Sequence, residues 1–280
     1  MWALLSALSS SILLAAALGG SPAGAESSRN VILSTTTSTQ DSGLLDVLVP
    51  MFERRTGYTL RAIAVGTGQA LALAARGEAD VTLAHAPALE KSYVASGTLR
   101  NRRLVMSNDF VLAGPAADPA RVAGTARAAD ALRRIAGAGA RFVSRGDNSG
   151  THALEQALWR EAGVVPGPPW YIESGQGMGA TLGLAHERGA YTLSDRATLL
   201  AFGRRLALAV MVEGDRSLLN VYSVMEVNPA NGPRVNARGG KAFADFMVSP
   251  EAQAVIRTFG LEKYGRPLFV PVAGKRDEDP

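Results

Sequence analysis

The feature that most limits the possible folds of this chain is a pattern of three parts. A short apolar run leads into a turn rich in Ser, Thr and Gly, and the turn leads into a helix-like segment. The clearest example is the turn Ser144–Thr151, which follows the strand-like run 140–143. Gly146 and Gly150 let the backbone turn tightly, and Ser149 or Thr151 stands where a helix N-cap belongs. The stretch therefore predicts a strand, a tight turn and a helix.

The same pattern occurs twice near the start of the chain. The turn Ser34–Thr39 follows a predicted strand, Val31–Leu33, and precedes a helix predicted from Ser42 to Thr56. The turn 66–68 follows a predicted strand, Thr59–Val65. In open α/β sheets, ligands bind beyond the carboxyl ends of the strands. We therefore expect the three turns to lie together and to form one binding site.

The chemistry of these turns favours an anion. The start of each helix presents backbone N–H groups that have no partner inside the helix, together with the positive end of the helix dipole. Arg145 adds one cation, and the hydroxyl groups add further donors. The candidate ligand-binding residues are Thr35, Thr36, Thr37, Ser38, Thr67, Gly68, Arg145, Ser149, Gly150 and Thr151.

The order of the remaining elements indicates an α/β protein. A third strand is predicted at Asp80–Ala84, which completes a βαβαβ unit and predicts a parallel sheet. The run Phe110–Pro115 reads as a strand that crosses into a second lobe, and Asn220–Val227 reads as a strand that returns to the first. A single long helix is predicted over Gly240–Phe259.

Composition restricts the class of protein further. Hydrophobic residues form 47% of the 280 residues, enough for a packed core, and the net charge of +4 is spread along the chain. No basic stripe with interleaved aromatic residues points to nucleic acid. The chain has no cysteine, which excludes disulfides, Fe–S clusters and a cysteine nucleophile.

The first 25 residues have the pattern of a cleaved signal peptide. They are apolar or small and end in Ala23-Gly24-Ala25, which fits the small-x-small rule for cleavage after Ala25. A lipid anchor would need a cysteine at the cleavage site. We therefore expect an exported protein that is released into the periplasm.

Several other functions compete with that of an anion-binding protein. The segment Ser174–Gly179 lacks the spacing of a dinucleotide fingerprint and reads as a helix entry, for which lining the cleft and forming a plain tight turn are the two alternatives. Ser144 and Ser149 lack a recognisable triad, and the three histidines lack the spacing of metal ligands. An enzyme with an oxyanion pocket and a ligand-sensing domain of a regulator are the alternatives from other classes. They are disfavoured because no triad, Walker motif or DNA-binding segment occurs.

Asp147 is the one carboxylate inside the three turns, and its orientation separates two kinds of anion. An oxyanion that is fully ionised at neutral pH needs a site with donors only. Phosphate still carries a proton and benefits from an acceptor carboxylate. A turn-forming role for Asp147 would favour a donor-only site, whereas a side chain facing the cleft would favour phosphate.

Five motifs together resemble the TupA-type tungstate-binding proteins, the solute-binding components of tungstate ABC importers. The motifs are Thr35–Thr39, Ala84–Lys91, Ser144–Thr151, Tyr191–Thr198 and Asn220–Val224, and the likeness runs from about Asn30 to Pro271. The resemblance implies a two-lobed periplasmic-binding-protein fold of type II, with two crossing strands as the hinge and the oxyanion in the cleft. It also implies delivery to a permease with a cytoplasmic ATPase.

The resulting prediction is a non-enzymatic tungstate-binding protein, a monomer without cofactor or metal site. Molybdate-, phosphate- or sulfate-binding proteins of the same fold are the alternative. We expect the signal peptide at residues 1–25, the first lobe at 26–111 plus 223–280, and the second lobe at 112–222.

Overall fold

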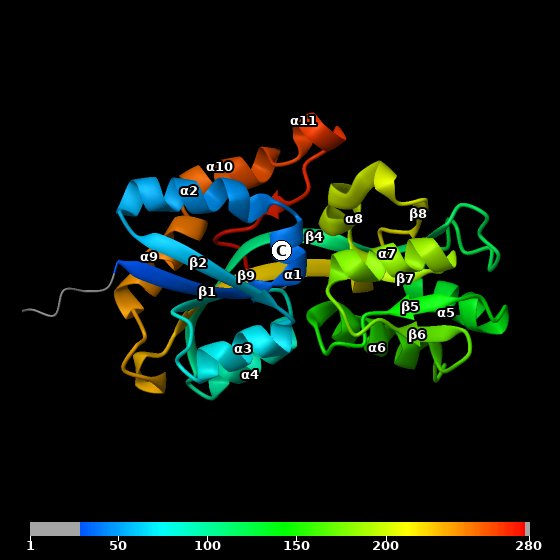
Figure 1. The fold of residues 1–280 in the computed structure, drawn as a ribbon, viewed down its shortest axis with the longest axis horizontal. Coiled ribbons are helices and arrows are strands. Elements are labelled where there is room, and N and C mark those ends of the chain that lie inside the picture. The colour runs from blue at the N-terminus through cyan, green and yellow to red at the C-terminus, as the bar shows by residue number, and fades with distance from the viewer. Residues whose placement is uncertain (1–28, 278–280) are drawn as a thin grey trace, which may run out of the picture.

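The computed structural model describes residues 29–277, and within this range the chain folds into two lobes that lie side by side (Figure 1). The first lobe holds β1–β3 with α1–α4 and α9–α11, and the second holds β5–β8 with α5–α8. Each lobe has its own hydrophobic core. The predicted signal peptide lies outside the described residues.

Parallel strands form the centre of the first lobe, as the βαβαβ pattern predicts. Strand β1 (Asn30–Thr36) pairs in parallel with β2 (Thr59–Val65) on one side and with β3 (Val81–Ala84) on the other. Each of the three strands runs directly towards a turn and a helix, so their carboxyl ends lie at one edge of the sheet. This edge faces the second lobe (Figure 1).

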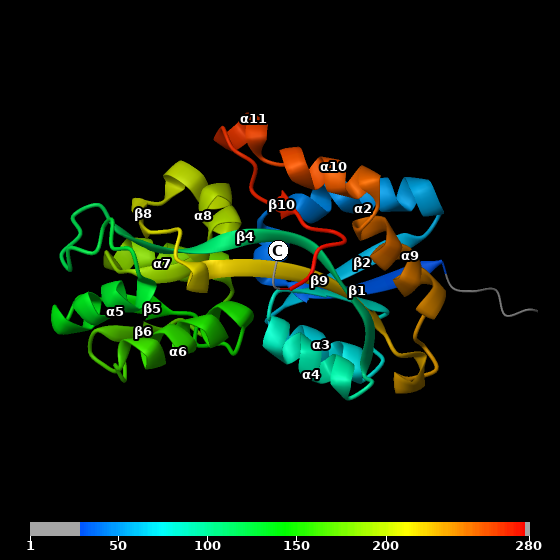
Figure 2. The ribbon, with the colours of Figure 1, turned by 180° about the vertical axis from the view of Figure 1, so that it is seen from behind.

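Two long strands connect the lobes. Strand β4 (Leu99–Pro115) carries the chain into the second lobe, and β9 (Leu219–Val227) brings it back. They pair antiparallel, and Figure 2 shows them side by side between the lobes. The predicted crossing at 110–115 was too short, because the strand begins at Leu99. A polar stretch that includes Arg102 and Arg103 concealed its first half.

The second lobe builds on the far half of β4. Strands β7 (Thr192–Asp195) and β8 (Leu208–Val212) both pair with β4, while β5 (Phe142–Ser144) and β6 (Tyr171–Glu173) form a separate parallel pair. A single bridge joins Phe142 of β5 to Tyr191, in parallel, just before β7. The ends of β5 and β7 therefore also lie at one edge, which faces the first lobe.

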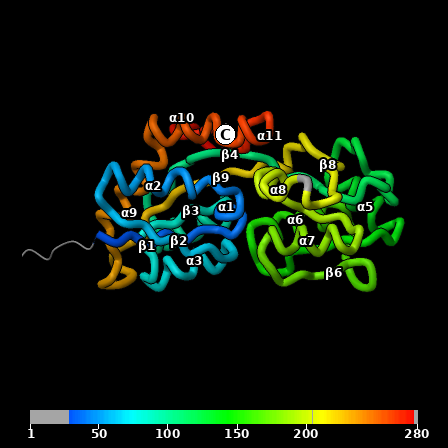
Figure 3. The backbone as a smooth tube through the Cα atoms, turned by 45° about the horizontal axis from the view of Figure 1, so that its top comes forward, coloured from blue at the N-terminus to red at the C-terminus, as the bar shows by residue number. Residues whose placement is uncertain are grey.

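The helices pack around these sheets, and Figure 3 shows how they surround each lobe. In chain order they are α1 (Thr37–Asp41), α2 (Leu44–Thr56), α3 (Thr67–Ala75), α4 (Pro87–Ala95), α5 (Ala128–Gly137), α6 (Gly150–Ala162), α7 (Met178–Arg188), α8 (Arg196–Phe202), α9 (Ala237–Met247), α10 (Pro250–Thr258) and α11 (Leu261–Tyr264). Short 3₁₀ turns lie at Gly203–Arg205, Arg216–Leu218 and Pro229–Asn231, and a last strand, β10 (Val270–Pro271), pairs with β4.

The single helix predicted over Gly240–Phe259 is wrong, because the chain forms two helices there. The first ends at Met247, and Ser249 accepts a hydrogen bond from the Ala252 N–H as the N-cap of the second, with Pro250 at its first position. Proline suits a first turn and disfavours a helix interior, which explains the break.

None of the helices in the described range, 29–277, is both long and apolar enough to cross a membrane. The exact lobe boundaries given above remain a prediction.

Candidate functional site

Arg145 lies at the centre of the surface where the lobes meet. Its side chain is 2% exposed. Nε donates to the Gln176 carbonyl at 3.2 Å, and Nη2 approaches the Thr37 hydroxyl of the first lobe at 3.4 Å. For Nη1, no hydrogen-bond partner occurs among residues 29–277. One face of the guanidinium is therefore fixed by protein, and the Nη1 group is left to donate elsewhere.

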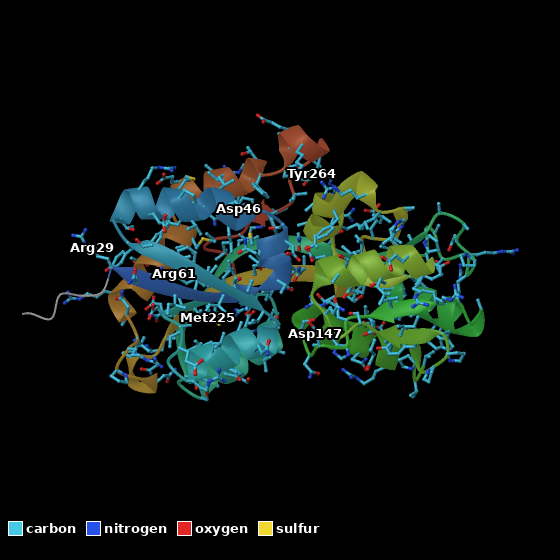
Figure 4. The ribbon with its side chains drawn as sticks, viewed as in Figure 1. Arg29, Asp46, Arg61, Asp147, Met225 and Tyr264 are labelled. Carbon is cyan, nitrogen blue, oxygen red and sulfur yellow. The ribbon has the colours of Figure 1, made fainter. Side chains whose placement is uncertain are left out.

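Asp147 balances this charge and shapes the turn. One carboxylate oxygen pairs with Arg145 Nη2, and the other accepts the Ser149 N–H at 3.2 Å. Figure 4 places Asp147 at the rim of the second lobe that faces the first. The side chain thus caps its own turn, as expected for a donor-only site.

The start of α6 supplies further donors beside Arg145. Ser149 is the N-cap and accepts the His152 N–H at 3.3 Å. The Gly150 N–H donates to the Thr67 hydroxyl of the first lobe at 3.2 Å. The Thr151 hydroxyl is fully buried and has no partner within the described part of the chain. A buried hydroxyl without a partner is unfavourable unless a ligand satisfies it.

The hydroxyl groups of the first turn are mostly bound to the protein itself. The Thr35 hydroxyl donates to the Leu83 carbonyl at 2.9 Å. Thr36 caps α1 by accepting the Thr39 N–H, and its oxygen also lies 3.1 Å from the Ser38 oxygen. The Thr35 and Thr36 hydroxyls are therefore committed to the protein itself.

Ser38 continues this chain of hydrogen bonds into the crossing strands. Its oxygen lies 3.0 Å from Nε2 of the buried His85, and Nδ1 of His85 lies 2.9 Å from the Asn220 amide oxygen on β9. Since Asn220 offers an acceptor there, Nδ1 carries the proton and Nε2 accepts the Ser38 hydroxyl proton. Asn220 in turn donates to the Asn108 amide oxygen on β4 at 2.8 Å.

Burial keeps His85 neutral. It lowers the pKa of His85 to about 4, and the nearby positive charge of Arg145 lowers it further, against the hydrogen bond to Asn220, which raises it. The imidazole also stacks on Tyr222, with ring centroids 4.6 Å apart. The histidine is thus a neutral support for the Ser38 turn and is not at the surface.

The third turn completes the arrangement. Thr67 begins α3, is buried, and accepts from Gly150, so its own hydroxyl proton remains available to donate. Gly68 lies close to Asn148, because a Cβ at Gly68 would come within 3.6 Å of the Asn148 carbonyl oxygen. Thr67 and Gly68, which belong to the third turn, therefore both lie against the Arg145 turn of the second lobe.

Among residues 29–277, three hydrogen bonds join the lobes through protein atoms alone. They are the bond of Arg145 to Thr37, the bond of Gly150 to Thr67, and a bond of 3.3 Å from the Thr198 hydroxyl to the Ser38 carbonyl. Gly177, the N-cap of α7, also packs against Thr37, since a Cβ there would lie 3.2 Å from the Thr37 hydroxyl oxygen. The segment Ser174–Gly179 is thus a helix entry that lines the cleft.

A second carboxylate lies close to Arg145. Asp195 ends β7 and caps α8 by accepting the Thr198 N–H at 2.8 Å. Burial raises the pKa of Asp195 to about 6, although hydrogen bonds from Thr198 and the charge of Arg145 lower it. Its Oδ2 atom is buried and has no hydrogen-bond partner in the described range.

The similarity of the chain to known proteins agrees with this geometry. A family model described as a PBP superfamily domain matches residues 22–251. A tungstate-binding protein TupA of Peptoclostridium acidaminophilum is 45% identical over 283 residues, with 97% of this chain and 99% of the relative covered. A TupA of Campylobacter jejuni is 37% identical, with 86% and 90% covered. The chain belongs to the TupA family of this superfamily.

Solved structures show the same family. The tungstate ABC transporter structure from Geobacter sulfurreducens is 48% identical, with a TM-score of 0.76 and 82% of this chain and 98% of that chain covered. The TupA structure from Desulfovibrio alaskensis G20 is 44% identical, with a TM-score of 0.72 and 87% and 99% covered. The predicted resemblance to TupA proteins and the predicted two-lobed fold are confirmed. The family is one of periplasmic solute-binding transport proteins.

Within this TupA fold, the three predicted turns lie together. Thr37, Ser38, Thr67, Gly68, Arg145 and Gly150 all lie at the contact between the lobes, whereas Thr151 is buried at the start of α6. The Thr35, Thr36 and Ser149 side chains bond within their own lobe instead. Sequence reasoning missed Asp195 and Asn220. For His85 the sequence indicated only that it lacks the spacing of a metal ligand. The strand-end positions of His85 and Asp195 were the available signals.

Proposed function

We propose that this chain binds tungstate between its two lobes and delivers it to an ABC importer. The arrangement of Arg145 and Thr151 supports this most directly. A buried cation with a free Nη1 group and a buried hydroxyl without a partner lie in the same strand-to-helix turn. These groups, with the N-termini of α3 and α6, offer donors to an anion.

The charge balance of the site suits a fully ionised oxyanion. Asp147 is already committed to Arg145 and to its own turn, so it offers no free acceptor to a protonated ligand. His85 is neutral, and its Nε2 accepts from Ser38. A tetrahedral dianion needs only donors, which is what these turns supply. Molybdate has the same charge and meets the same requirement.

Phosphate and sulfate remain the competing ligands. One observation favours phosphate, namely the buried Asp195 Oδ2 near Arg145, because an ionised carboxylate could accept the proton that phosphate retains. Against this, the relatives that cover most of this chain are named for tungstate. We therefore place phosphate second.

The family supports the remaining parts of the proposal. We infer that the partner permease works with a cytoplasmic ATPase and that the protein acts as a monomer, without enzymatic activity. We further infer that residues 1–25 direct export and are removed, and that the mature protein is released rather than lipid-anchored, since the chain has no cysteine.

Calorimetric titration tests the function. Protein beginning at Glu26 is titrated with tungstate, molybdate, sulfate and phosphate, each alone and then in competition. We expect one-to-one binding of tungstate that sulfate and phosphate do not displace. Displacement of tungstate by phosphate would indicate that phosphate is the ligand. Binding of none of the four anions would refute the proposed function.

A further inference from the structure

A fourth strand-to-helix turn lies at the contact between the lobes, in addition to the three described above. His85 and Ala86 form this turn, which joins β3 to α4. It lies against the start of α6, because a Cβ at Gly150 would be 3.3 Å from the His85 carbonyl oxygen and 3.6 Å from the Ala86 Cβ. The β3–α4 turn is therefore part of the surface that the second lobe meets.

The start of α4 is not capped in the usual way. Ala86 stands at the N-cap, where its side chain has no oxygen to accept a backbone N–H, and Pro87 follows at the first helical position. Glu90, which lies one turn into the helix, holds this end instead. Its Oε1 atom accepts the Ala86 N–H at 2.7 Å, and its backbone N–H donates to the Ala86 carbonyl at 3.0 Å. Both polar backbone groups of Ala86 are thus bonded to one residue.

The second carboxylate oxygen of Glu90 bonds to the two strands that connect the lobes. Oε2 accepts from Arg102 Nε on β4 at 2.9 Å and from the Ser223 hydroxyl on β9. The Glu90 side chain is fully buried, and that of Arg102 is 11% exposed. Asp277 also pairs with Arg102, at 2.8 Å. The carboxylate therefore fixes the β3–α4 turn relative to β4 and β9.

Stability alone does not account for this buried ion pair. Taking two charges out of water costs free energy, and replacing a buried pair by apolar side chains of similar volume is often neutral or stabilising. The other reason to keep such a pair is that it fixes a particular arrangement. Here the arrangement is the place of Ala86, because the carboxylate that pairs with Arg102 also holds the Ala86 N–H.

We propose that Glu90 is a positioning residue for closure of the lobes around the oxyanion. By holding Ala86, it keeps the His85 carbonyl and the Ala86 side chain at the distance from which Gly150 can approach and bond to Thr67. The inference rests on the proposed function, in which the closed lobes enclose the anion. Glu90 acts through the backbone of the β3–α4 turn. Movement of that turn towards Gly150 would hinder closure and weaken binding.

The test replaces the buried ion pair with apolar side chains of similar length, Glu90→Met with Arg102→Met. The matched control is Arg103→Met with Glu226→Met. This ion pair of 3.3 Å also lies on β4, but neither of its residues bonds to a turn at the cleft within residues 29–277. In calorimetric titrations we expect the first double variant to bind tungstate about tenfold more weakly and the control to stay within about twofold of the wild type. Equal effects of the two double variants would overturn the proposal.

The imidazole of His85 gives a readout of the turn that does not depend on the anion. Burial lowers the pKa of His85 to about 4. If Glu90 holds the turn, its loss lets water reach the imidazole, and the pKa measured by NMR moves towards the usual value of 6.5. We expect no such change in the control variant. Weaker tungstate binding with an unchanged His85 pKa would contradict a role through the turn.

Glu90→Gln keeps the test decisive if the double variant does not fold. Its single side-chain oxygen is expected to face Arg102, because a charged donor forms the stronger hydrogen bond. The NH₂ group then faces the Ala86 N–H and releases the turn. Weaker tungstate binding with a raised His85 pKa would support the proposal, and wild-type values of both would refute it. If the wild type binds none of the four oxyanions, the proposed function fails, and the His85 pKa in the Glu90 variants alone decides whether Glu90 holds the turn.

Discussion

The two lobes hold similar turns in different ways. In the first lobe, the turn at Thr36–Thr39 is held by neutral groups, a chain of hydroxyls that ends on His85 and Asn220. In the second lobe, the Arg145 turn is held by a charged group, Asp147, which pairs with Arg145 and accepts the Ser149 N–H. Both turns follow strands and precede helices, so local sequence alone makes them look equivalent. The difference is that the second-lobe turn brings the positive charge of Arg145 to the cleft, whereas the turn Thr36–Thr39 holds no charged residue.

This asymmetry has a physical advantage for a dianion. A single cation, fixed on one side and balanced by Asp147, attracts the ligand without leaving a strong unpaired charge at the surface. Neutral donors on the other side then approach the anion without charge repulsion between the lobes. The comparison predicts that substitutions in the second-lobe turn act on binding, whereas those in the first-lobe turn act mainly on stability.

The largest effect is expected from Arg145→Ala. We predict a loss of about 3 kcal/mol of tungstate binding free energy, because the variant removes a buried charged donor and leaves Asp147 unpaired beside the anion. Titration calorimetry measures it. Arg55→Ala is the control, since Arg55 forms an exposed pair with Glu251 away from the cleft. Unchanged affinity in Arg145→Ala would show that the charge of Arg145 does not contribute to binding. The proposed difference between the lobes would then fail.

The variant His85→Gln tests the neutral groups that hold the first-lobe turn, through the pH dependence of stability. The folded protein keeps His85 unprotonated down to a pKa of about 4, whereas in the unfolded chain it takes up a proton near its usual value of 6.5. His85 therefore makes the wild type less stable as pH falls through this window, by about 3 kcal/mol at most. Asp195 and Glu155, whose pKa values are raised, act in the opposite direction there.

The measurement for His85 is thus the difference between two proteins. Unfolding free energies from urea titrations of wild type and His85→Gln are compared at pH 7 and near pH 4. We expect the gap between them to move in favour of the variant as pH falls. His186→Gln, an exposed histidine on α7, is the control. A gap that does not depend on pH would mean that His85 takes up its proton in the folded protein over the same pH range as in the unfolded chain.

Thr151→Val distinguishes a ligand-binding hydroxyl from a structural one. We predict a loss of about 1 kcal/mol of binding free energy, with no loss of stability in the absence of ligand, because the Thr151 hydroxyl has no partner among residues 29–277. Calorimetry and thermal unfolding give the two values. A fall in melting temperature without a change in affinity would assign the hydroxyl to the fold.

The smallest effect on binding is expected from Thr35→Val. The Thr35 hydroxyl donates to the Leu83 carbonyl, so the variant should lose about 1 kcal/mol of stability and keep its tungstate affinity within about twofold. A clear loss of affinity in the same titration would show that the Thr35 hydroxyl contributes to anion binding. It would also weaken the contrast between the lobes.

The sequence predicted the parts of the site that depend on local chemistry. A turn rich in Ser, Thr and Gly between a strand and a helix is a local signal, so the three turns could be located. The geometry of the cleft could not be predicted from the sequence. The contact between Ser38 and His85 spans 47 residues and that between His85 and Asn220 spans 135, and both depend on how β1, β3 and β9 pair.

Two elements were predicted wrongly from the sequence, the helix over Gly240–Phe259 and the start of β4. The break at Ser249-Pro250 carried a clear local signal that the apolar periodicity of the segment outweighed. The first half of β4 carried almost no local signal of a strand. Arg102 and Arg103 are held there by ion pairs with Glu90, Asp277, Glu226 and Asp245, and these pairs exist only in the folded protein.

The three hydrogen bonds that join the lobes bear on selectivity. Specificity is a difference between affinities, so any interaction that is identical for every ligand cancels. The bonds from Arg145 to Thr37, from Gly150 to Thr67 and from Thr198 to Ser38 run between protein atoms and contribute equally whichever oxyanion the lobes enclose. Such bonds can make closure tight for all four anions. Discrimination between tungstate and its competitors must therefore come from the few groups that these bonds leave free.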